Sequence, residues 1–222
     1  MATNPRPEVT VGTLISGAVD ITKQNLGIVL PAVGGLAVLA TIGQYLTING
    51  SLALGGLVQL GVLIAAVIVG YIVLETMLKQ AGLMAYSGPR RFLPFLGLSI
   101  VVGVGVILGM ILLIVPGVYL AVRWSLAQPR LVGRGDGVFD AIKASWKLTD
   151  GYAMRIFLCI LALGLVVVVI AIIAGLLGPT NIIGILIGQL ANYALTMVML
   201  GLSVTLLGEI DPLGRKLSEV FE

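Results

Sequence analysis

The stretch of sequence that decides the fold runs from Ile156 to Gly208 and reads IFLCILALGLVVVVIAIIAGLLGPTNIIGILIGQLANYALTMVMLGLSVTLLG. It contains no Asp, Glu, Lys or Arg. A helix needs about 20 apolar residues to cross the hydrocarbon core of a bilayer, so this stretch is long enough for two spans. Its centre, Gly178-Pro-Thr-Asn181, carries residues that end helices and form turns. The pattern predicts transmembrane helices over 153–177 and 182–208.

A second charge-free stretch, from Gln24 to Leu74, has the same organisation. The turn signal at its centre is Asn49-Gly-Ser51. It predicts helices over 27–47 and 52–75. Because the first long apolar run begins only near Leu26, we interpret it as a retained span and not as a cleaved signal peptide.

A third charge-free stretch, from Phe92 to Val122, is too long for one untilted span and too short for two. Val115-Pro-Gly117 interrupts it, and proline followed by glycine is a strong signal for a helix to stop and reverse. We predict helices over 93–114 and 118–133, with a turn at Pro116-Gly117. The alternative is a re-entrant hairpin with its tip at the same two residues, which would leave four full spans.

The composition excludes an ordinary soluble domain. Of the 222 residues, 59% are apolar and 10% are charged, whereas soluble domains carry about 25% charged residues. The net charge is +3, but the basic residues are spread among loops without a nucleic-acid-binding motif, so nucleic acid is not an expected partner. The expected partners are the lipid bilayer, anionic lipid headgroups, and other membrane subunits or a second copy of the chain.

Basic residues flank the third stretch on both sides. Arg90 and Arg91 precede it, and Arg134, Lys143 and Lys147 follow it. Loops rich in Lys and Arg stay on the cytoplasmic side, so the chain must cross the membrane an even number of times between them. Under this threading, or with the re-entrant hairpin, all 13 basic and 10 acidic residues are expected on the cytoplasmic side or at its interface, and both termini are cytoplasmic.

Two segments between the spans have the periodicity of amphipathic helices. In 137–150, Phe139, Ile142 and Trp146 oppose Asp140, Lys143 and Lys147; in 11–25, Leu14, Ala18 and Ile21 oppose Ser16, Asp20 and Lys23. We expect both segments at the inner membrane surface, with Trp124, Trp146, Lys143 and Lys147 contacting the interface. Aligning Ile15 with Ile142 and Thr22 with Thr149 suggests an internal repeat, which two identities alone do not establish.

The predicted fold class is an all-α polytopic transmembrane helix bundle of about six spans with two amphipathic interfacial helices, in a single domain over 1–222. In order, its parts are a cytoplasmic tail with an amphipathic segment (1–25), a hairpin (27–75), a hairpin (93–133), an amphipathic helix (137–150), a hairpin (153–208) and a cytoplasmic tail (209–222).

The candidate functional site comprises polar residues expected within or beside the spans. Arg123 is placed about 9 Å from the outer end of the fourth helix, and a charge in hydrocarbon marks a functional site by default. It either binds a lipid phosphate or carboxylate, or it snorkels or pairs with Glu75. Gln189 and Asn192 lie three residues apart, so both are expected on one face of their helix. We expect them, and other uncharged polar residues such as Gln44, either to line a polar path or to form interhelical hydrogen bonds.

Small residues spaced four apart, at Gly105 and Gly109 and at Gly184 and Gly188, favour close helix packing. No catalytic machinery is recognisable. The chain has no histidine, its only cysteine is Cys159 within an apolar run, and it carries no phosphate-binding loop, nucleophile elbow or metal-ligand cluster. We therefore expect no catalytic residue, cofactor or metal.

The segment from Ile114 to Pro129, IVPGVYLAVRWSLAQP, followed by Asp140 to Gly151, DAIKASWKLTDG, resembles a recognisable stretch of a bacterial membrane-protein family. This is the family named after the membrane domain of glycerophosphoryl diester phosphodiesterases, with YciC-like proteins as relatives. The resemblance implies a compact six-helix domain in the bacterial cytoplasmic (inner) membrane. The phosphodiesterases carry a separate catalytic domain that uses histidine, so their activity is not carried over, and the tail 209–222 is more acidic than the family pattern.

Two functions follow from these observations. The first is a non-enzymatic accessory or organising subunit of a larger membrane assembly or of its lipids. The second is a small transporter or lipid-handling protein with a polar site around Arg123. A polar cavity that reaches Arg123 would favour the second function.

Overall fold

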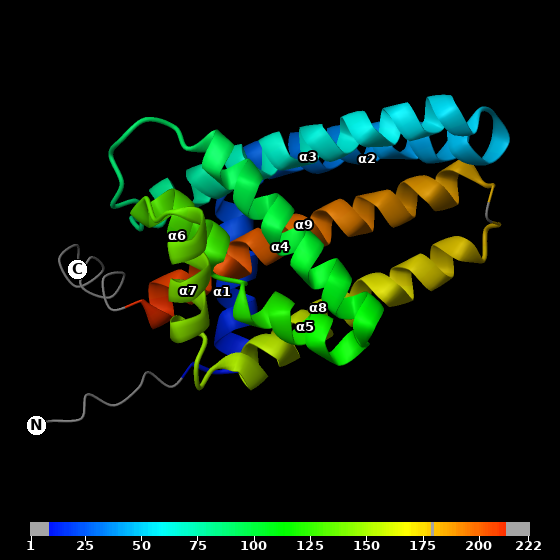
Figure 1. The fold of residues 1–222 in the computed structure, drawn as a ribbon. Coiled ribbons are helices and arrows are strands. Elements are labelled where there is room, and N and C mark those ends of the chain that lie inside the picture. The colour runs from blue at the N-terminus through cyan, green and yellow to red at the C-terminus, as the bar shows by residue number, and fades with distance from the viewer. Residues whose placement is uncertain (1–8, 179, 212–222) are drawn as a thin grey trace, which may run out of the picture.

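The structure, a computed structural model, describes residues 9–178 and 180–211, and these residues form helices joined by short connections (Figure 1). In chain order the helices are α1 (Val11–Gln24), α2 (Leu26–Asn49), α3 (Leu52–Gln80), α4 (Phe92–Leu112), α5 (Ile114–Arg123), α6 (Ala127–Arg134), α7 (Val138–Leu148), α8 (Ala153–Gly175) and α9 (Ile182–Ile210). The all-helical class is confirmed. Of the predicted tails, 1–8 and 212–222 lie outside the described residues.

Five of these helices are long and apolar enough to cross a membrane, namely α2, α3, α4, α8 and α9. Figure 1 shows α2 and α3 running side by side as one hairpin, and α8 and α9 forming another. Both hairpins occupy the ranges in which the sequence predicts them. The chain is thus a multi-pass membrane protein by the length and composition of its helices.

The predicted helix over 118–133 is wrong. The chain instead forms α5 and α6, which are separated at 124–126. The ten residues of α5 rise about 15 Å, half of a hydrocarbon core of about 30 Å, and α5 is not among the candidate spans. Six full spans are therefore not confirmed.

The turn between α4 and α5 lies at Leu113, whose backbone is extended, and not at Pro116-Gly117. Pro116 stands in the first turn of α5, where its missing N–H needs no partner within the helix. Gly117 brings α5 against α4, because an added Cβ would lie 2.6 Å from the backbone nitrogen of Met110. A Cβ at Gly109 would lie 2.8 Å from the Cα of Gly117. The Pro-Gly pair therefore serves helix packing.

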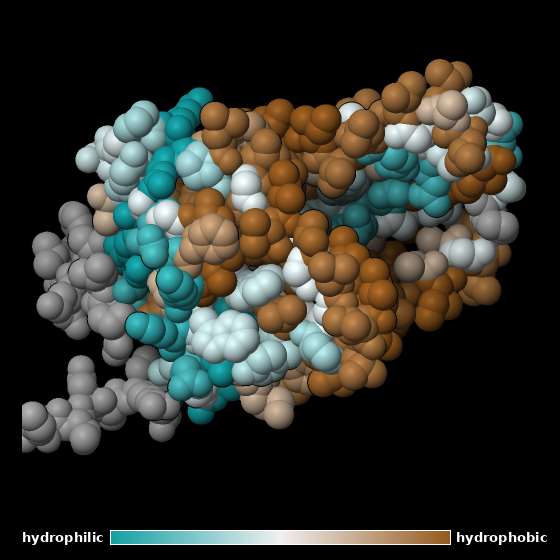
Figure 2. Space-filling view, viewed as in Figure 1, coloured by the Kyte–Doolittle hydropathy of each residue, from teal (hydrophilic) through white to brown (hydrophobic). Residues whose placement is uncertain are grey.

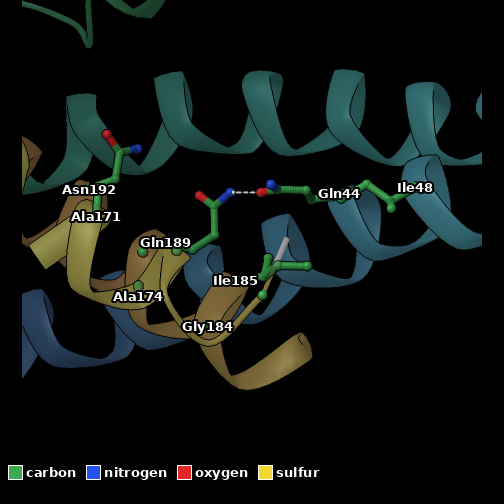
Figure 3. A pocket seen from close by; sticks show the side chains of 11 residues that line it. Gln44, Ile48, Ala171, Ala174, Gly184, Ile185, Gln189 and Asn192 are labelled. Carbon is green, nitrogen blue, oxygen red and sulfur yellow. Dashed lines mark hydrogen bonds between the residues drawn. The ribbon is translucent and has the colours of Figure 1, made fainter. Parts of the chain in front are cut away.

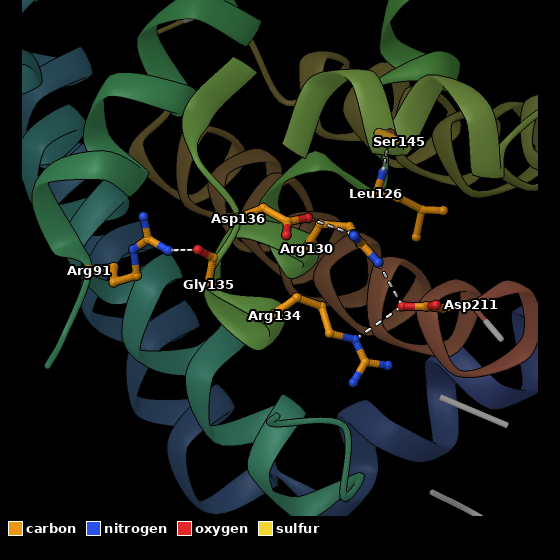
Figure 4. Close-up of polar contacts among 8 residues, drawn as sticks. All are labelled: Arg91, Leu126, Arg130, Arg134, Gly135, Asp136, Ser145 and Asp211. Atoms are coloured by element: carbon orange, nitrogen blue, oxygen red, sulfur yellow. Dashed lines mark hydrogen bonds and ion pairs between the residues drawn. The ribbon is translucent and has the colours of Figure 1, made fainter. Parts of the chain in front are cut away.

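The break between α5 and α6 is closed by Ser145 of α7, which is fully buried. Its hydroxyl donates to the carbonyl oxygen of Arg123 at 2.6 Å. It also accepts a hydrogen bond from the backbone nitrogen of Leu126 at 3.1 Å (Figure 4). A single side chain thus satisfies one acceptor and one donor that the interrupted helix leaves unpaired. This tertiary contact allows the chain to change direction after Arg123.

Charged and polar groups gather at one end of the bundle, formed by α1, the loop 81–91, α6 and α7, which we call the charged end. Figure 2 shows this end in teal and the hairpins mostly in brown. Much of the buried core lies here as well, with Leu74, Leu78, Leu131 and Leu207 almost completely enclosed. The opposite end, which carries the turns of the hairpins, is the distal end.

Helix α1 packs one face against α9. It buries Leu14, Ala18 and Thr22, and it approaches α9 so closely that a Cβ at Gly201 would lie 2.6 Å from the carbonyl oxygen of Ala18. Helix α7 leaves Lys143 and Lys147 exposed. Both helices form where amphipathic segments are predicted, and their placement at a membrane surface stays a prediction.

The buried positions of α1 and α7 follow one register. The alignment that pairs Ile15 with Ile142 also pairs Leu14 with Ala141, Ala18 with Ser145 and Thr22 with Thr149, and all six of these residues are buried. Each threonine hydroxyl donates to the carbonyl oxygen four residues earlier, at 2.7 Å from Thr22 and 2.9 Å from Thr149. Each of the two helices also precedes a hairpin of long helices. These parallels favour the internal repeat.

Gly55 offers the first test of this packing. An added Cβ would lie 2.5 Å from the backbone nitrogen of Thr47, which cannot move without shifting α2. We expect Gly55→Ala to lower the free energy of unfolding by about 1–3 kcal/mol, the usual cost of overpacking. An SDS titration of the purified protein measures the change. Gly56→Ala is the matched control, because a Cβ there meets nothing within 4 Å, and equal effects would contradict the predicted contact.

Candidate functional site

Arg123 joins α5 to α7 at the charged end. Its Nε donates to the hydroxyl of Tyr119 at 3.0 Å, its Nη1 to the carbonyl oxygen of Trp146 at 3.3 Å, and its Nη2 to Asp150 at 3.2 Å. The guanidinium also lies 5.3 Å from the ring centre of Tyr119 and 5.1 Å from that of Trp146. Each nitrogen of the guanidinium is used within the chain, so Arg123 stabilises the hairpin on α7.

The other candidate residues lie elsewhere. Glu75 pairs with Lys79 and lies 3.8 Å from Arg90, so the predicted pair of Arg123 with Glu75 is wrong. Arg123 pairs with Asp150 at the charged end because the short α5 returns there, which also corrects its predicted place near the outer end of a span. Gln189 and Asn192 lie near the distal end, so the four residues do not form one site.

A buried ionic cluster holds the charged end together (Figure 4). Arg130 donates to Asp136 at 2.8 Å and to Asp211 at 2.9 Å, and the Nε of Arg134 donates to the same oxygen of Asp211 at 3.1 Å. The side chains of Asp211 and Arg134 are only 3% and 5% exposed. Among the described residues, the Nη1 and Nη2 of Arg134 are buried without a hydrogen-bond partner. The cluster fastens α6 to the end of α9.

The loop 81–91 is fastened to the same region. The backbone nitrogens of Ala85 and Tyr86 donate to the carbonyl oxygen of Gly133, at 2.9 and 3.0 Å. The guanidinium of Arg91 donates to the carbonyl oxygen of Gly135 and lies 5.3 Å from the ring centre of Tyr86. Most of the ionic and polar contacts at this end therefore serve to connect segments of the chain.

A distal cavity of about 480 Å³ lies between α2, α8 and α9 (Figure 3). Gln44, Gln189 and Asn192 contribute amides to its lining, and Nε2 of Gln189 donates to Oε1 of Gln44 at 2.7 Å. Of the two predicted packing glycines here, Gly184 contacts the carbonyl oxygen of Ala174, since a Cβ would lie 2.7 Å away. A Cβ added at Gly188 would meet nothing within 4 Å, and Gly188 lines the cavity.

A central cavity of about 380 Å³ lies between α4, α5, α8 and α9. Its polar lining comprises Trp124, Ser125, Gln128, Thr196 and Ser203, and its apolar lining includes Val106, Ile160 and Leu206. The ring of Trp124 lies against α4 at Gly105, where an added Cβ would come within 2.5 Å of it. Within the described part of the chain, the Nε1 of Trp124 is buried and has no hydrogen-bond partner. A donor left in this state costs about 1–3 kcal/mol.

Arg123 lines neither cavity. The residues predicted to contact the membrane interface fall into two groups. Trp146, Lys143 and Lys147 are exposed on α7, whereas the indole nitrogen of Trp124 is buried. Comparisons of the chain with known protein families, with curated proteins and with solved structures found no match. Evidence on function therefore comes from the site itself.

Sequence reasoning missed Ser145 and Asp211 as organisers of the charged end. Both act through partners distant in the sequence, Ser145 at the break between α5 and α6 and Asp211 on Arg130 and Arg134. One feature of the sequence could have predicted the role of Asp211, since a carboxylate at the C-terminal end of a helix opposes the helix dipole and needs a cation nearby. No feature of the sequence predicts the role of Ser145.

Proposed function

We propose that the protein is a non-enzymatic membrane module that organises a larger membrane assembly or the lipids around it. In this proposal it sits in a bacterial cytoplasmic membrane with the charged end and both termini in the cytoplasm. The resemblance to the membrane domain of glycerophosphoryl diester phosphodiesterases belongs to the same proposal. The charged end is the rigid base, and the hairpins are the surfaces offered to lipids and to other spans.

One observation carries this proposal: the chain leaves its spans largely uncovered, whereas several arginines at the charged end are paired within the chain. In the most apolar part of α8, only 11% of the residues are buried, and in α4 only 17%. Leu161, Leu165 and Ile172 of α8 are each more than half exposed. Such faces contact lipid or the small and apolar residues of neighbouring helices. At the charged end, by contrast, Arg123, Arg130 and Arg134 contact partners within the chain.

The α4–α5 hairpin adds a second element to the proposal. It leaves the charged end at Phe92 and returns there at Arg123, which pairs with Asp150. Its short arm, α5, reaches only about 15 Å, whereas α4 is long enough to span the membrane but runs obliquely to α2 and α3 (Figure 1). We therefore propose that α4 is tilted and that the tip at Leu113 ends near the middle of the bilayer. In Figure 1 this tip ends short of the turns of the other two hairpins. Residues 111–115 are strongly exposed and apolar, which suits an element inserted in one leaflet.

Cysteine labelling tests the depth of this tip. In a background with Cys159→Ala, we expect Leu113→Cys to resist a membrane-impermeant maleimide from either side, because the thiol lies in hydrocarbon. Ser51→Cys, at the turn of the α2–α3 hairpin, is the control and should react from outside. Reaction of Leu113→Cys from outside as fast as that of Ser51→Cys would show that the α4–α5 hairpin crosses the membrane.

In-cell photo-crosslinking tests the proposed function. A photoreactive phenylalanine replaces Leu165 on the exposed face of α8 or Leu54 on that of α3, and the matched control replaces exposed Lys143 at the charged end. We expect one recurrent membrane protein, or a second copy of this chain, to be captured from the span positions and not from the control. Capture of lipid alone at both span positions, with recovery of a single monodisperse chain, would contradict the assembly role.

A second candidate function, the handling of a lipid, is favoured by the central cavity. Arg123 has no part in it, which departs from the site predicted from the sequence. Trp124, whose indole nitrogen is buried without a hydrogen-bond partner in the described part of the chain, is among the residues that line this cavity, and apolar side chains form most of the rest. Neither the distal cavity nor the charged end offers this combination in the residues described.

A further inference from the structure

We infer that the distal cavity is a hydrated site for a small neutral solute, whose hydroxyl groups are recognised by the side-chain amides of Gln44, Gln189 and Asn192. This site is separate from the central cavity, and its assignment does not rest on the proposed assembly role. It rests on the accessible amides, on their depth below the distal turns and on the uncharged lining.

Three side-chain amides of the distal cavity keep hydrogen-bonding groups that the chain does not use (Figure 3). Nε2 of Gln189 donates to Oε1 of Gln44, which leaves Nε2 of Gln44 and Oε1 of Gln189 without a partner among the described residues. The side-chain amide of Asn192 makes no hydrogen bond within the same part of the chain. The free atoms of the two glutamines keep accessible surface, and Asn192 is exposed, so a molecule in the cavity can reach all three amides. Amides both donate and accept, so they suit a ligand that does the same.

The amides lie well below the distal turns. Asn192 is ten residues beyond the start of α9 and Gln44 is five residues before the end of α2, which places them about 15 and 8 Å along their helices. In a bilayer spanned by α2 and α9 this depth is within hydrocarbon, where an amide without a partner costs about 1–3 kcal/mol. Lipid chains cannot supply a partner, whereas water or a polar solute can. The lining extends to Gly178 in the distal turn, and Figure 2 shows hydrophilic side chains in a recess near that end, so water can enter there.

The charge and the size of the distal cavity point to a small neutral solute. Of the residues described, those that line it include no Asp, Glu, Lys or Arg, so an ion would lose its hydration without gaining an opposite charge. Cβ atoms added at Gly175, Gly178 or Gly188 would meet nothing within 4 Å, so these glycines border open space. The volume of about 480 Å³ falls in the usual range for small-ligand sites. A polyol fits these limits, because each of its hydroxyls donates and accepts without carrying a charge.

Thiol labelling in nanodiscs tests whether the distal cavity is hydrated. In the Cys159→Ala background, Gly188→Cys places a thiol in the cavity without a clash, and Ile187→Cys, at an exposed position outside the lining, is the matched control. Both faces of a nanodisc are open to reagent, so the result does not depend on which end of the protein is cytoplasmic. We expect a neutral, hydrophilic methanethiosulfonate to react at least about tenfold faster with Gly188→Cys, because a thiol in hydrocarbon keeps its proton. Equal rates would show that lipid fills the cavity and would overturn the inference.

Protection of the same thiol tests the class of ligand. We expect erythritol, a neutral polyol, to slow the labelling of Gly188→Cys in a saturable manner, whereas its carboxylate analogue erythronate should leave the rate unchanged.

Asn192→Leu tests the recognition by the amides. It removes an amide that makes no hydrogen bond among the described residues, so the fold should be kept. We expect it to raise the concentration of erythritol that gives half protection about three- to tenfold, the contribution of one neutral hydrogen bond. The comparison of the two solutes stands even if this variant fails to fold.

No protection by erythritol, equal protection by erythronate, or protection that a folded Asn192→Leu variant leaves unchanged would each overturn the inference. The assembly role, which crosslinking tests separately, would be unaffected.

Discussion

Asp211→Asn is expected to lower the free energy of unfolding by about 3–5 kcal/mol, the usual cost of removing one partner of a buried ion pair. One carboxylate oxygen of Asp211 accepts hydrogen bonds from both Arg130 and Arg134, and the Asp211 side chain is only 3% exposed. An amide keeps the size of the side chain but removes its charge. Arg134 then loses the anion that compensates its burial, Arg130 keeps only Asp136, and the ion pairs that join α6 to the end of α9 are weakened.

The loss is measured as a shift of the SDS unfolding midpoint in purified protein. Asp140→Asn is the matched control, since Asp140 is an exposed residue in the first turn of α7 and the same change of charge there should alter stability by less than about 0.5 kcal/mol. Similar midpoints for the two variants would contradict the structural role of the ionic cluster.

The second large effect is expected at the crossing of α1 and α9. An added Cβ at Gly201 would lie 2.6 Å from the carbonyl oxygen of Ala18 and 2.8 Å from Oγ1 of Thr22. The first of these atoms is backbone, so α1 must move away from α9, and Thr22, whose hydroxyl bonds Ala18, must move with it. We expect Gly201→Ala to destabilise the protein by about 1–3 kcal/mol, despite the higher helix propensity of alanine.

Gly188→Ala provides the control on the same helix. A Cβ at Gly188 meets nothing within 4 Å, so the substitution should be neutral or should stabilise α9 by up to about 1 kcal/mol. Thermal unfolding in detergent compares the two variants with the unmodified protein. If Gly201→Ala also stabilises, α1 does not pack on α9 as described.

Long helices were the part of the fold that the sequence predicted best. The helices predicted over 27–47 and 182–208 correspond to α2 (Leu26–Asn49) and α9 (Ile182–Ile210). The predicted and observed ranges agree because charge-free runs and turn residues are local signals, which do not depend on the segments packed around them. The prediction for the region after Pro116 was wrong because a Pro-Gly pair can either reverse a helix or allow two helices to pack closely. Only the contact of Gly117 with α4 shows which of the two applies here.

The candidate site was less predictable, since its contacts join residues far apart in the chain. Arg123 was singled out from the sequence as a charge within a span, whereas its partner Asp150 lies across the break that Ser145 closes. Gln189 was expected to bond across helices or to line a polar path; it bonds Gln44 of α2 and is among the residues that line the distal cavity. Such pairings depend on tertiary packing, which periodicity does not encode.

The two ends of the molecule differ in how they are held together. The charged end is held by ion pairs and by backbone contacts such as those of Gly133, whereas cavities lie between the long helices. In a bilayer, lipid chains or partner helices fill such gaps where their lining is apolar.

Cysteine accessibility in spheroplasts measures on which side of the membrane the charged end and the distal turns lie. In the Cys159→Ala background, single cysteines replace exposed Ser87 and Lys143 at the charged end and Ser51 and Thr180 at the distal turns. We predict that an impermeant maleimide labels the two distal positions in intact spheroplasts and reaches the other two only after permeabilisation. Labelling of Ser87→Cys and Lys143→Cys from opposite faces would contradict the account.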